Sequence, residues 1–357
     1  LLVPVMMAVG FDSITAVAII LLGSQIGCLA STLNPFATVI ASDTAGVPAA
    51  EGIVLRLIFW FVMVAMSTYF VYRYADKIQK DPTKSLVYKQ REEDLKHFNV
   101  SESDDTPSVL SKKQKHVLFL FVTTFVIMVA SFIPWKDLHI SLFENFNTWL
   151  TGLPVIGKII GSSTGALGTW YFPEGAMLFA VMGIVIGIVY GLKEDKIISS
   201  FMNGAADLLS VAMICAVARG IQVIMNDGMI TATILHWGEE GLKGLSSQLF
   251  IILTYIFYLP MSFLIPSSSG LASATMGIMA PLGEFVNVKG SLIITAYQAA
   301  SGVLNLVAPT SGIVMGALAL GRISLGTWWK FIGKLIVALI VVSILLLLLG
   351  TFIPAIG

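Results

Sequence analysis

The sequence predicts an all-α protein that crosses a membrane several times and contains an inverted internal repeat. Of its 357 residues, 56% are hydrophobic and only 12% are charged, with a mean hydropathy of +0.88. Soluble domains carry about 25% charged residues, so this composition is that of a membrane protein. The segment Leu335–Gly357 has no charged residue and is long enough to cross a bilayer.

Other apolar stretches of spanning length occupy residues 53–72, 117–133, 176–191, 198–218 and 248–265. The aromatic pairs Phe59–Trp60 and Trp328–Trp329 fit belts at the membrane–water interface.

Residues 73–116 form the one long polar stretch, with 10 of the 21 Lys and Arg residues and 8 acidic residues. Short loops rich in Lys and Arg stay on the cytoplasmic side, so we expect a cytoplasmic loop here. Its composition is typical of a solvated, partly disordered linker.

Composition and motifs exclude several classes of function. The formal net charge is zero, which gives no electrostatic basis for binding a nucleic acid. Cys28 and Cys215 lack CxxC spacing, and the four histidines form no HExxH pattern. No GxxxxGK[ST] motif is present, which argues against a nucleotide-driven pump. We therefore expect no cofactor or catalytic metal, and only Na⁺ or H⁺ as a coupling ion.

Residues 5–60 and 278–329 carry the same features in the same order. Each has an acid, an apolar helix with a glutamine, a polar break with Asn and Pro, a small-residue helix and an aromatic-led span. The paired positions are Asp12 and Glu284, Gln25 and Gln298, and Asn34–Pro35 and the stretch from Asn305 to Pro309. The surrounding charges orient the two final spans oppositely, which is typical of inverted-repeat secondary transporters. On this pattern the first unit begins upstream of residue 1, by roughly 160 residues if the halves match.

The two polar breaks are candidate binding elements. Backbone that leaves helical geometry inside a bilayer needs protein or water to satisfy its N–H and C=O groups. A proline frees a carbonyl, and neighbouring Asn, Thr and Ser add side-chain oxygens, which suits Na⁺ or the polar groups of a solute. The alternative is a locally satisfied proline kink. Two breaks at corresponding positions favour a binding site.

Residues 263–284 predict a re-entrant helical hairpin whose tip contains Pro266, three serines and Gly270. A helix beginning near Ser269 would favour an anionic group such as a carboxylate. An ordinary extramembrane turn is the alternative, because Pro-Ser-Ser-Ser-Gly is good turn chemistry.

A third candidate region, residues 204–240, carries Asp207, Arg219 and Asp227 within predominantly apolar sequence. Charges in such surroundings face a partner or an aqueous pathway. Arg219 could pair with Asp227, hold a substrate carboxylate or lie at an interface, and these alternatives stay open.

Several long stretches resemble one transporter family. They read "VPVMMAVGFDS", "ASTLNPFATVIAS", "ARGIQVIMNDGMITATILH", "FLIPSSSGLASATMGIMAPLGE" and "NLVAPTSGIVMGALALG". The chain resembles the C4-dicarboxylate anaerobic carrier-like family of the ion transporter superfamily, and more closely its YfcC branch, labelled basic amino acid (arginine/ornithine-type) antiporters. The resemblance implies a multi-pass secondary carrier of the bacterial inner membrane, with re-entrant hairpins, unwound helices and elevator-type motion against a scaffold.

The resemblance also implies which residues line the site. Substrate contacts are expected at Ser31, Thr32, Asn34, Ser267, Ser268, Ser269, Gly270, Asn305, Thr310 and Ser311. Arg219 and Asp227 are further candidates because of their charges within apolar sequence, not because of the resemblance. Cation contacts are expected at Asn34, Pro35, Ser269, Asn305, Ala308 and Pro309.

The same resemblance divides the chain into parts with different roles. They are 1–72 (first repeat, with its broken helix and a scaffold helix), 73–116 (cytoplasmic loop), 117–196 (scaffold), 197–330 (transport elements) and 331–357 (final scaffold span). A homodimer through scaffold helices is expected.

The substrate class stays open at this stage. A basic amino acid calls for carboxylates near the site, and Asp12, Asp227 and Glu284 are available. A C4-dicarboxylate calls for Arg219 and the hairpin N–H groups instead. Two other functions are weaker alternatives. Inverted broken helices favour a carrier over a channel. An intramembrane serine hydrolase would depend on the GxSxG match at 161–165, but no His and Asp are placed to complete a catalytic triad.

Overall fold

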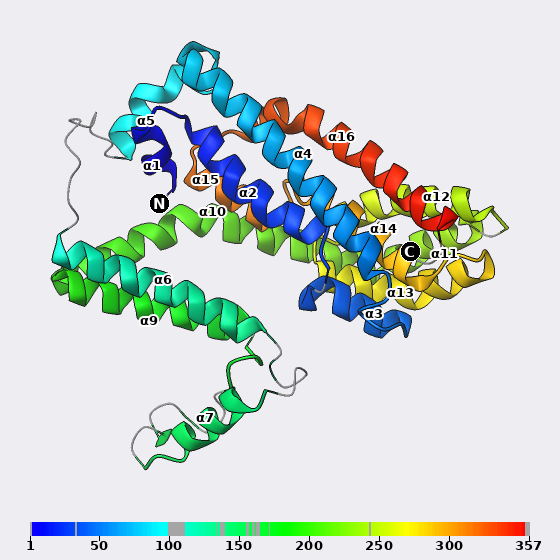
Figure 1. The fold of residues 1–357 in the computed structure, drawn as a ribbon, viewed down its shortest axis with the longest axis horizontal. Coiled ribbons are helices and arrows are strands. Elements are labelled where there is room, and N and C mark those ends of the chain that lie inside the picture. The colour runs from blue at the N-terminus through cyan, green and yellow to red at the C-terminus, as the bar shows by residue number, and fades with distance from the viewer. Residues whose placement is uncertain are drawn as a thin grey trace. The chain divides into compact units, whose positions relative to one another are not determined.

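The computed structural model contains only helices and connecting turns in the part of the chain that it describes (Figure 1). The described residues are 2–32, 34–98, 111–133, 135, 140–154, 157–158, 161, 165–170, 172–242 and 244–353. The chain divides into two compact units, one of residues 1–104 with 206–357 and one of residues 105–205. Each unit is described by itself.

Five helices in the described residues are long and apolar enough to cross a membrane. They are α4 (Ile53–Lys80), α6 (Lys112–Phe132), α9 (Phe172–Tyr190), α12 (Ser247–Leu264) and α16 (Leu325–Phe352). These helices confirm the expected helical, multi-pass membrane architecture. The span expected at 198–218 lies within α10 (Glu194–Asp227), where several side chains lie outside the described residues, so this span stays a prediction.

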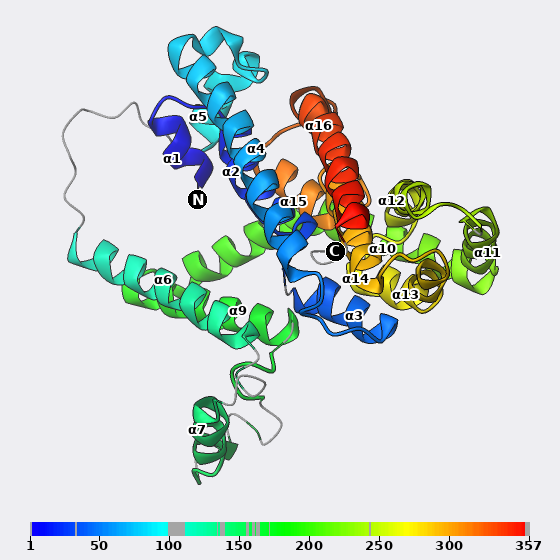
Figure 2. The ribbon, with the colours of Figure 1, turned by 45° about the vertical axis from the view of Figure 1, so that its right-hand side comes forward.

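In the unit of residues 105–205, α6 and α9 lie side by side (Figures 1 and 2). The rings of Phe125 and Phe179 meet edge to face, with centroids 5.4 Å apart. A short helix, α7 (Leu142–Thr151), belongs to the same unit.

The larger unit contains one succession of elements twice. A first helix is followed by a break, a short helix and a long apolar helix. The first succession is α2 (Ser13–Leu29), a π-helical turn η1 (Pro35–Val39), α3 (Ile40–Ala45) and α4. The second is α14 (Gly290–Leu304), α15 (Gly312–Leu320) and α16. Before them stand α1 (Leu2–Ala8) and, in the second case, α11 (Ile230–Leu242), α12 and α13 (Ser268–Phe285).

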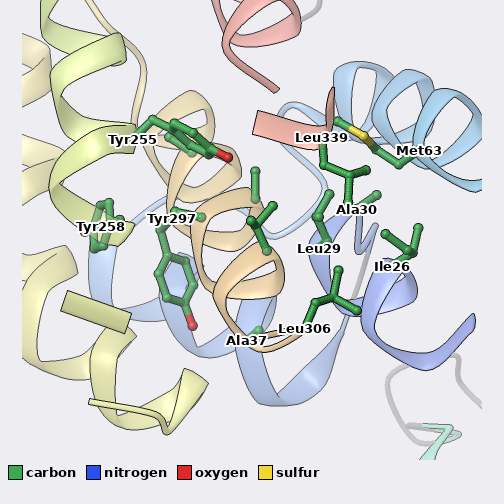
Figure 3. Close-up of a cluster of buried hydrophobic side chains, with 14 of the residues drawn as sticks. Ile26, Leu29, Ala30, Ala37, Met63, Tyr255, Tyr258, Tyr297, Leu306 and Leu339 are labelled. Carbon is green, nitrogen blue, oxygen red and sulfur yellow. The ribbon is translucent and has the colours of Figure 1, made fainter. Parts of the chain in front are cut away.

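Helix α14 is the centre of this unit. Every residue from Gly290 to Val303 is buried, and α14 packs against α2, α12, α13 and α16. Figure 3 shows this packing, with Leu29 of α2 on one flank of α14 and Tyr297 of α14 on the other, toward Tyr258. An apolar helix that is covered on all sides is a core element, so the groups at its end are held by the whole unit.

The polar loop differs from the expected linker. Helix α4 continues to Lys80, and η2 (Pro82–Lys84), η3 (Tyr88–Gln90) and α5 (Arg91–His97) follow it. Val87 and Asp94 are buried, and the hydroxyl of Ser85 donates a hydrogen bond to Asp12. The interpretation of 73–98 as a solvated linker is therefore wrong, because buried contacts and the ion pairs of Glu93 and Asp94 with Arg322 hold this segment on the helices. Residues 99–110 lie outside the described residues.

Candidate functional site

The first break follows α2, as the sequence predicts. After Leu29 the chain makes a polar turn before η1 begins at Pro35. The Ser31 and Thr38 hydroxyls are buried and hydrogen-bonded at 3.0 Å, and the backbone N–H of Asn34 donates to the Ser31 hydroxyl at 2.9 Å. The turn therefore replaces part of the lost helical hydrogen bonding with side-chain oxygens.

The second break separates α14 from α15 at residues 305–311. Ala308 and Ser311 are buried beside Pro309. The hydroxyl oxygen of Thr310 is also buried, and it has no hydrogen-bond partner among the described residues. A buried polar atom of this kind calls for a partner, and the described residues do not supply one.

The hairpin tip lies between α12 and α13. Helix α12 ends at Leu264 and α13 begins at Ser268, one residue before the start expected from the sequence. The hydroxyl of Ser267 caps α13 by accepting a hydrogen bond from the Gly270 N–H at 3.2 Å, and it lies 3.4 Å from the Ser269 hydroxyl. The tip therefore presents hydroxyl groups at a helix N-terminus, where partial positive charge collects.

Two adjacent residues of α14 join the tip to the first break. The hydroxyl of Tyr297 donates to the Ser268 carbonyl oxygen at 2.5 Å. The amide nitrogen of Gln298 donates to the Thr38 hydroxyl at 2.6 Å and to the Ser31 carbonyl oxygen at 3.3 Å. Since α14 itself ends in the second break, one buried helix connects all three elements.

The two helices that lead into the breaks are also in direct contact. A Cβ atom on Gly302 would lie 2.4 Å from the Cα atom of Leu29, so the two backbones touch at this point. The first break begins just after Leu29 and the second begins three residues after Gly302. Both breaks therefore lie beside one packing contact, as the internal repeat predicts.

Most of the predicted site residues lie on these three elements. Ser31, Thr32, Asn34 and Pro35 belong to the first break, and Asn305, Ala308, Pro309, Thr310 and Ser311 to the second. Ser267, Ser268, Ser269 and Gly270 form the tip. Their roles in binding stay predictions.

The charged residues of the third region are not joined to this group by any described contact. Asp227 is exposed at the end of α10, and Arg219 lies on the same helix with its side chain outside the described residues. Both stay predictions. Ser162, Ser163 and Thr164 of the GxSxG match also lie outside the described residues.

The acids of the repeat lie far from the breaks. Asp12 caps the opposite end of the 17-residue helix α2, about 25 Å from the first break. Its carboxylate accepts hydrogen bonds from Thr15, Tyr74 and Ser85, so it is a structural cap. Glu284 is exposed near the far end of α13, about 24 Å from the tip. Neither acid can contact a solute held at the breaks in this conformation.

Sequence reasoning missed three residues that hold the site together. Arg56 is 1% exposed, and its Nη1 donates to the Thr32 carbonyl oxygen in the first break at 2.9 Å. A single charge within an apolar stretch is itself a signal of function, and it could have identified Arg56. Gln298 was noted as a repeat feature without a role, while Tyr297 gave no signal.

The described residues hold no group of three or more His, Cys, Asp or Glu side chains that could bind a metal ion. The oxygens at the breaks come from hydroxyl, amide and carbonyl groups. Such neutral oxygen donors suit a hard monovalent cation better than a transition metal.

Comparisons with known proteins agree with the resemblance of the sequence motifs. The C4-dicarboxylate anaerobic carrier family matches residues 1–352. An uncharacterised protein of Haemophilus influenzae is 32% identical over 347 residues, which cover 97% of this chain and 62% of that protein. The "Putative basic amino acid antiporter YfcC" of Escherichia coli is 27% identical over 354 residues, which cover 96% of this chain and 63% of that protein. No solved structure matches the chain.

The chain thus spans less than two thirds of the length of these two relatives. The names of the family and of the Escherichia coli relative indicate transport rather than catalysis. Because the family match extends over nearly every residue, the chain belongs to the C4-dicarboxylate anaerobic carrier family.

Proposed function

We propose that the protein is a secondary active carrier, an antiporter or ion-coupled symporter, of small carboxylate-bearing solutes. Amino acids, in particular basic ones of the arginine/ornithine type, are the first substrate class to test. One observation carries the proposal. Adjacent residues of α14, Tyr297 and Gln298, bond the hairpin tip and the first break, and α14 itself ends in the second break.

The tip offers a place for a carboxylate. The N-terminus of α13 at Ser268 carries partial positive charge, and the hydroxyls of Ser267 and Ser269 lie beside it. Anionic groups bind well at helix N-termini because free N–H groups and the helix dipole act together. The proposed substrate carboxylate therefore contacts the tip.

The breaks offer oxygens for a positive group. The Oε1 atom of Gln298 and the hydroxyl oxygen of Thr310 are buried and have no hydrogen-bond partner among the described residues. Oxygens of this kind favour Na⁺ or the ammonium group of an amino acid. Asn34, Pro35, Asn305, Ala308, Pro309 and Ser269 are the proposed cation contacts. Na⁺ and H⁺ remain the two proposed coupling ions.

Transport requires that the site open to each side in turn. We propose that the two successions of broken helix, short helix and long helix are inverted copies, and that they move as an elevator in a bacterial inner membrane. Helices α4 and α16 pack in the same compact unit as the breaks. The sequence assigned both helices to the scaffold, and that assignment stays part of the proposal. Scaffold helices within 117–196 are proposed to form a homodimer.

A C4-dicarboxylate is the second candidate substrate. The family name favours it, and so does the position of the acids. Asp12 and Glu284 lie at the far ends of their helices, so neither can meet the side-chain cation of a basic amino acid at the breaks. This observation removes two of the three acids available to a basic amino acid and leaves Asp227, at the end of α10, as the remaining carboxylate candidate.

The test is counterflow in proteoliposomes that contain the full-length protein. Vesicles loaded with unlabelled arginine, a neutral amino acid or succinate are given the labelled solute, with and without a Na⁺ or a pH gradient. A carrier takes up label faster when the same solute is inside. Uptake that ignores the internal solute would indicate a channel, and no uptake of any of the three solutes would refute the proposal.

A further inference from the structure

The carbonyl oxygens of the second break are bonded by the helix that follows it. The indole N–H of Trp328 donates to the Leu306 carbonyl at 2.8 Å, and that of Trp329 donates to the Val307 carbonyl at 3.0 Å. Trp328 is 0% exposed, so it is not the interfacial belt residue that the sequence suggested. Two neighbouring indoles thus satisfy two consecutive carbonyls that a continuous helix would have bonded internally.

The first break shows the same relation with different chemistry. Arg56 donates to the Thr32 carbonyl of the break, and also to the carbonyls of Ala49 and Glu51 in the loop before α4. Arg56 is the fourth residue of α4, and Trp328 is the fourth residue of α16. Corresponding positions in the two successions therefore donate hydrogen bonds back to the breaks.

These bonds decide which oxygens remain for a ligand. A carbonyl that already accepts an indole or guanidinium N–H has lost part of its capacity to bind a cation, and its direction is fixed. The bonded carbonyls of Leu306 and Val307 stand directly between Asn305 and Pro309. When these two carbonyls are held, the backbone that carries Asn305 and Thr310 is held as well. The hydroxyl of Thr310 has no hydrogen-bond partner among the described residues.

We infer that Trp328, Trp329 and Arg56 are positioning residues, which hold the two breaks in their binding shape by donating hydrogen bonds from the first turn of the following helix. None of them needs to touch the solute. The inference rests on the proposed function where it concerns affinity, but the holding of the breaks is independent of what is transported.

The test uses Trp328→Phe in the full-length protein, because phenylalanine keeps an aromatic ring and removes the N–H donor. Trp237→Phe is the matched control, since Trp237 is 69% exposed on α11. Amide hydrogen exchange is measured in peptides that cover 305–311, and half-saturation constants for solute and for Na⁺ are measured beside the maximal rate. Arg56→Lys, which keeps the charge but loses the planar fork, tests the first break in the same way.

We expect faster exchange at 305–311 in Trp328→Phe and a half-saturation constant raised about threefold to tenfold, with the maximal rate little changed. The control should match the wild type in both. Unchanged exchange at the break would overturn the inference. So would a fall in folded protein and maximal rate with an unchanged half-saturation constant, because that pattern indicates a purely structural role. If the wild type transports nothing, the proposed function fails, while the exchange result still decides whether Trp328 holds the break.

Discussion

The contact between Gly302 and Leu29 allows a sharp test of how the two breaks are brought together. Replacing Gly302 by alanine adds one methyl group at the point where α14 meets α2. That carbon would lie 2.4 Å from the Cα atom and 2.8 Å from the backbone nitrogen of Leu29. Favourable carbon–carbon separations are about 3.5–4.0 Å, so the helices must part by about 1 Å or more.

The expected cost follows from this geometry. Overpacking of a core costs about 1–3 kcal/mol, and the upper end applies because the clash is with backbone rather than with a flexible side chain. Alanine is favoured over glycine within a helix by about 1 kcal/mol. The net prediction for Gly302→Ala is a loss of about 2 kcal/mol in the free energy of unfolding.

The measurement is thermal and chemical unfolding of the full-length protein, together with counterflow. Gly333→Ala in α16 is the matched control, because nothing lies within 4 Å of a Cβ atom at Gly333. The control should be as stable as the wild type or up to about 1 kcal/mol more stable. The reasoning is refuted if Gly302→Ala unfolds no more easily than Gly333→Ala and transports at the wild-type rate.

Three further predictions concern single contacts. Tyr297→Phe removes the hydroxyl that donates to the Ser268 carbonyl, and it should cost about 1 kcal/mol and speed amide exchange at the hairpin tip. Gln298→Leu removes the donor to the first break, and it should cost about 1–3 kcal/mol in chemical unfolding and raise the half-saturation constant for solute. Burial raises the pKa of the Asp94 carboxyl, against the opposing attraction of Arg322. The folded state then holds that proton more tightly, so this contribution to stability is complete below the unfolded pKa of about 3.9 and is lost as the pH rises through the folded pKa. In Asp94→Asn the loss of stability with rising pH should be smaller than in the wild type. The measurement is the melting temperature of both proteins at a series of pH values from about 4 to about 7.

Each of these predictions can fail separately. Unchanged exchange at the tip in Tyr297→Phe would mean that the hydroxyl does not hold it. A wild-type half-saturation constant in Gln298→Leu would mean that the hydrogen bond from α14 to the first break does not contribute to solute binding. A pH profile of Asp94→Asn identical to that of the wild type would show that another group titrates.

The sequence predicts those parts of the fold that are encoded locally. Five spans follow from hydropathy, and the breaks follow from Asn and Pro within apolar runs. The tip follows from three serines beside a proline, which set the start of α13 to within one residue. The stretch 198–218 lies in α10, where several side chains are outside the described residues, so the span expected there stays a prediction.

Contacts between distant segments could not be predicted in the same way. No feature of the sequence around Gln298 indicates that it bonds Thr38, because the two residues are 260 positions apart. Arg56 and Trp328 each bond a carbonyl more than twenty residues away, and carbonyls carry no sequence signal. The polar loop was misjudged for a related reason. Its charges indicate solvent, yet Asp94 is buried against Arg322, whose Nη1 lies 3.1 Å from the carboxylate.

The most direct test of the central claim is a cryo-electron microscopy map of the full-length protein with a transported solute and Na⁺ bound. The account predicts solute density enclosed by the N-terminus of α13, the first break at 30–39 and the second break at 305–311, with its carboxylate toward Ser267–Ser269. Solute density remote from these three elements, or helix that runs unbroken through both breaks, would contradict it.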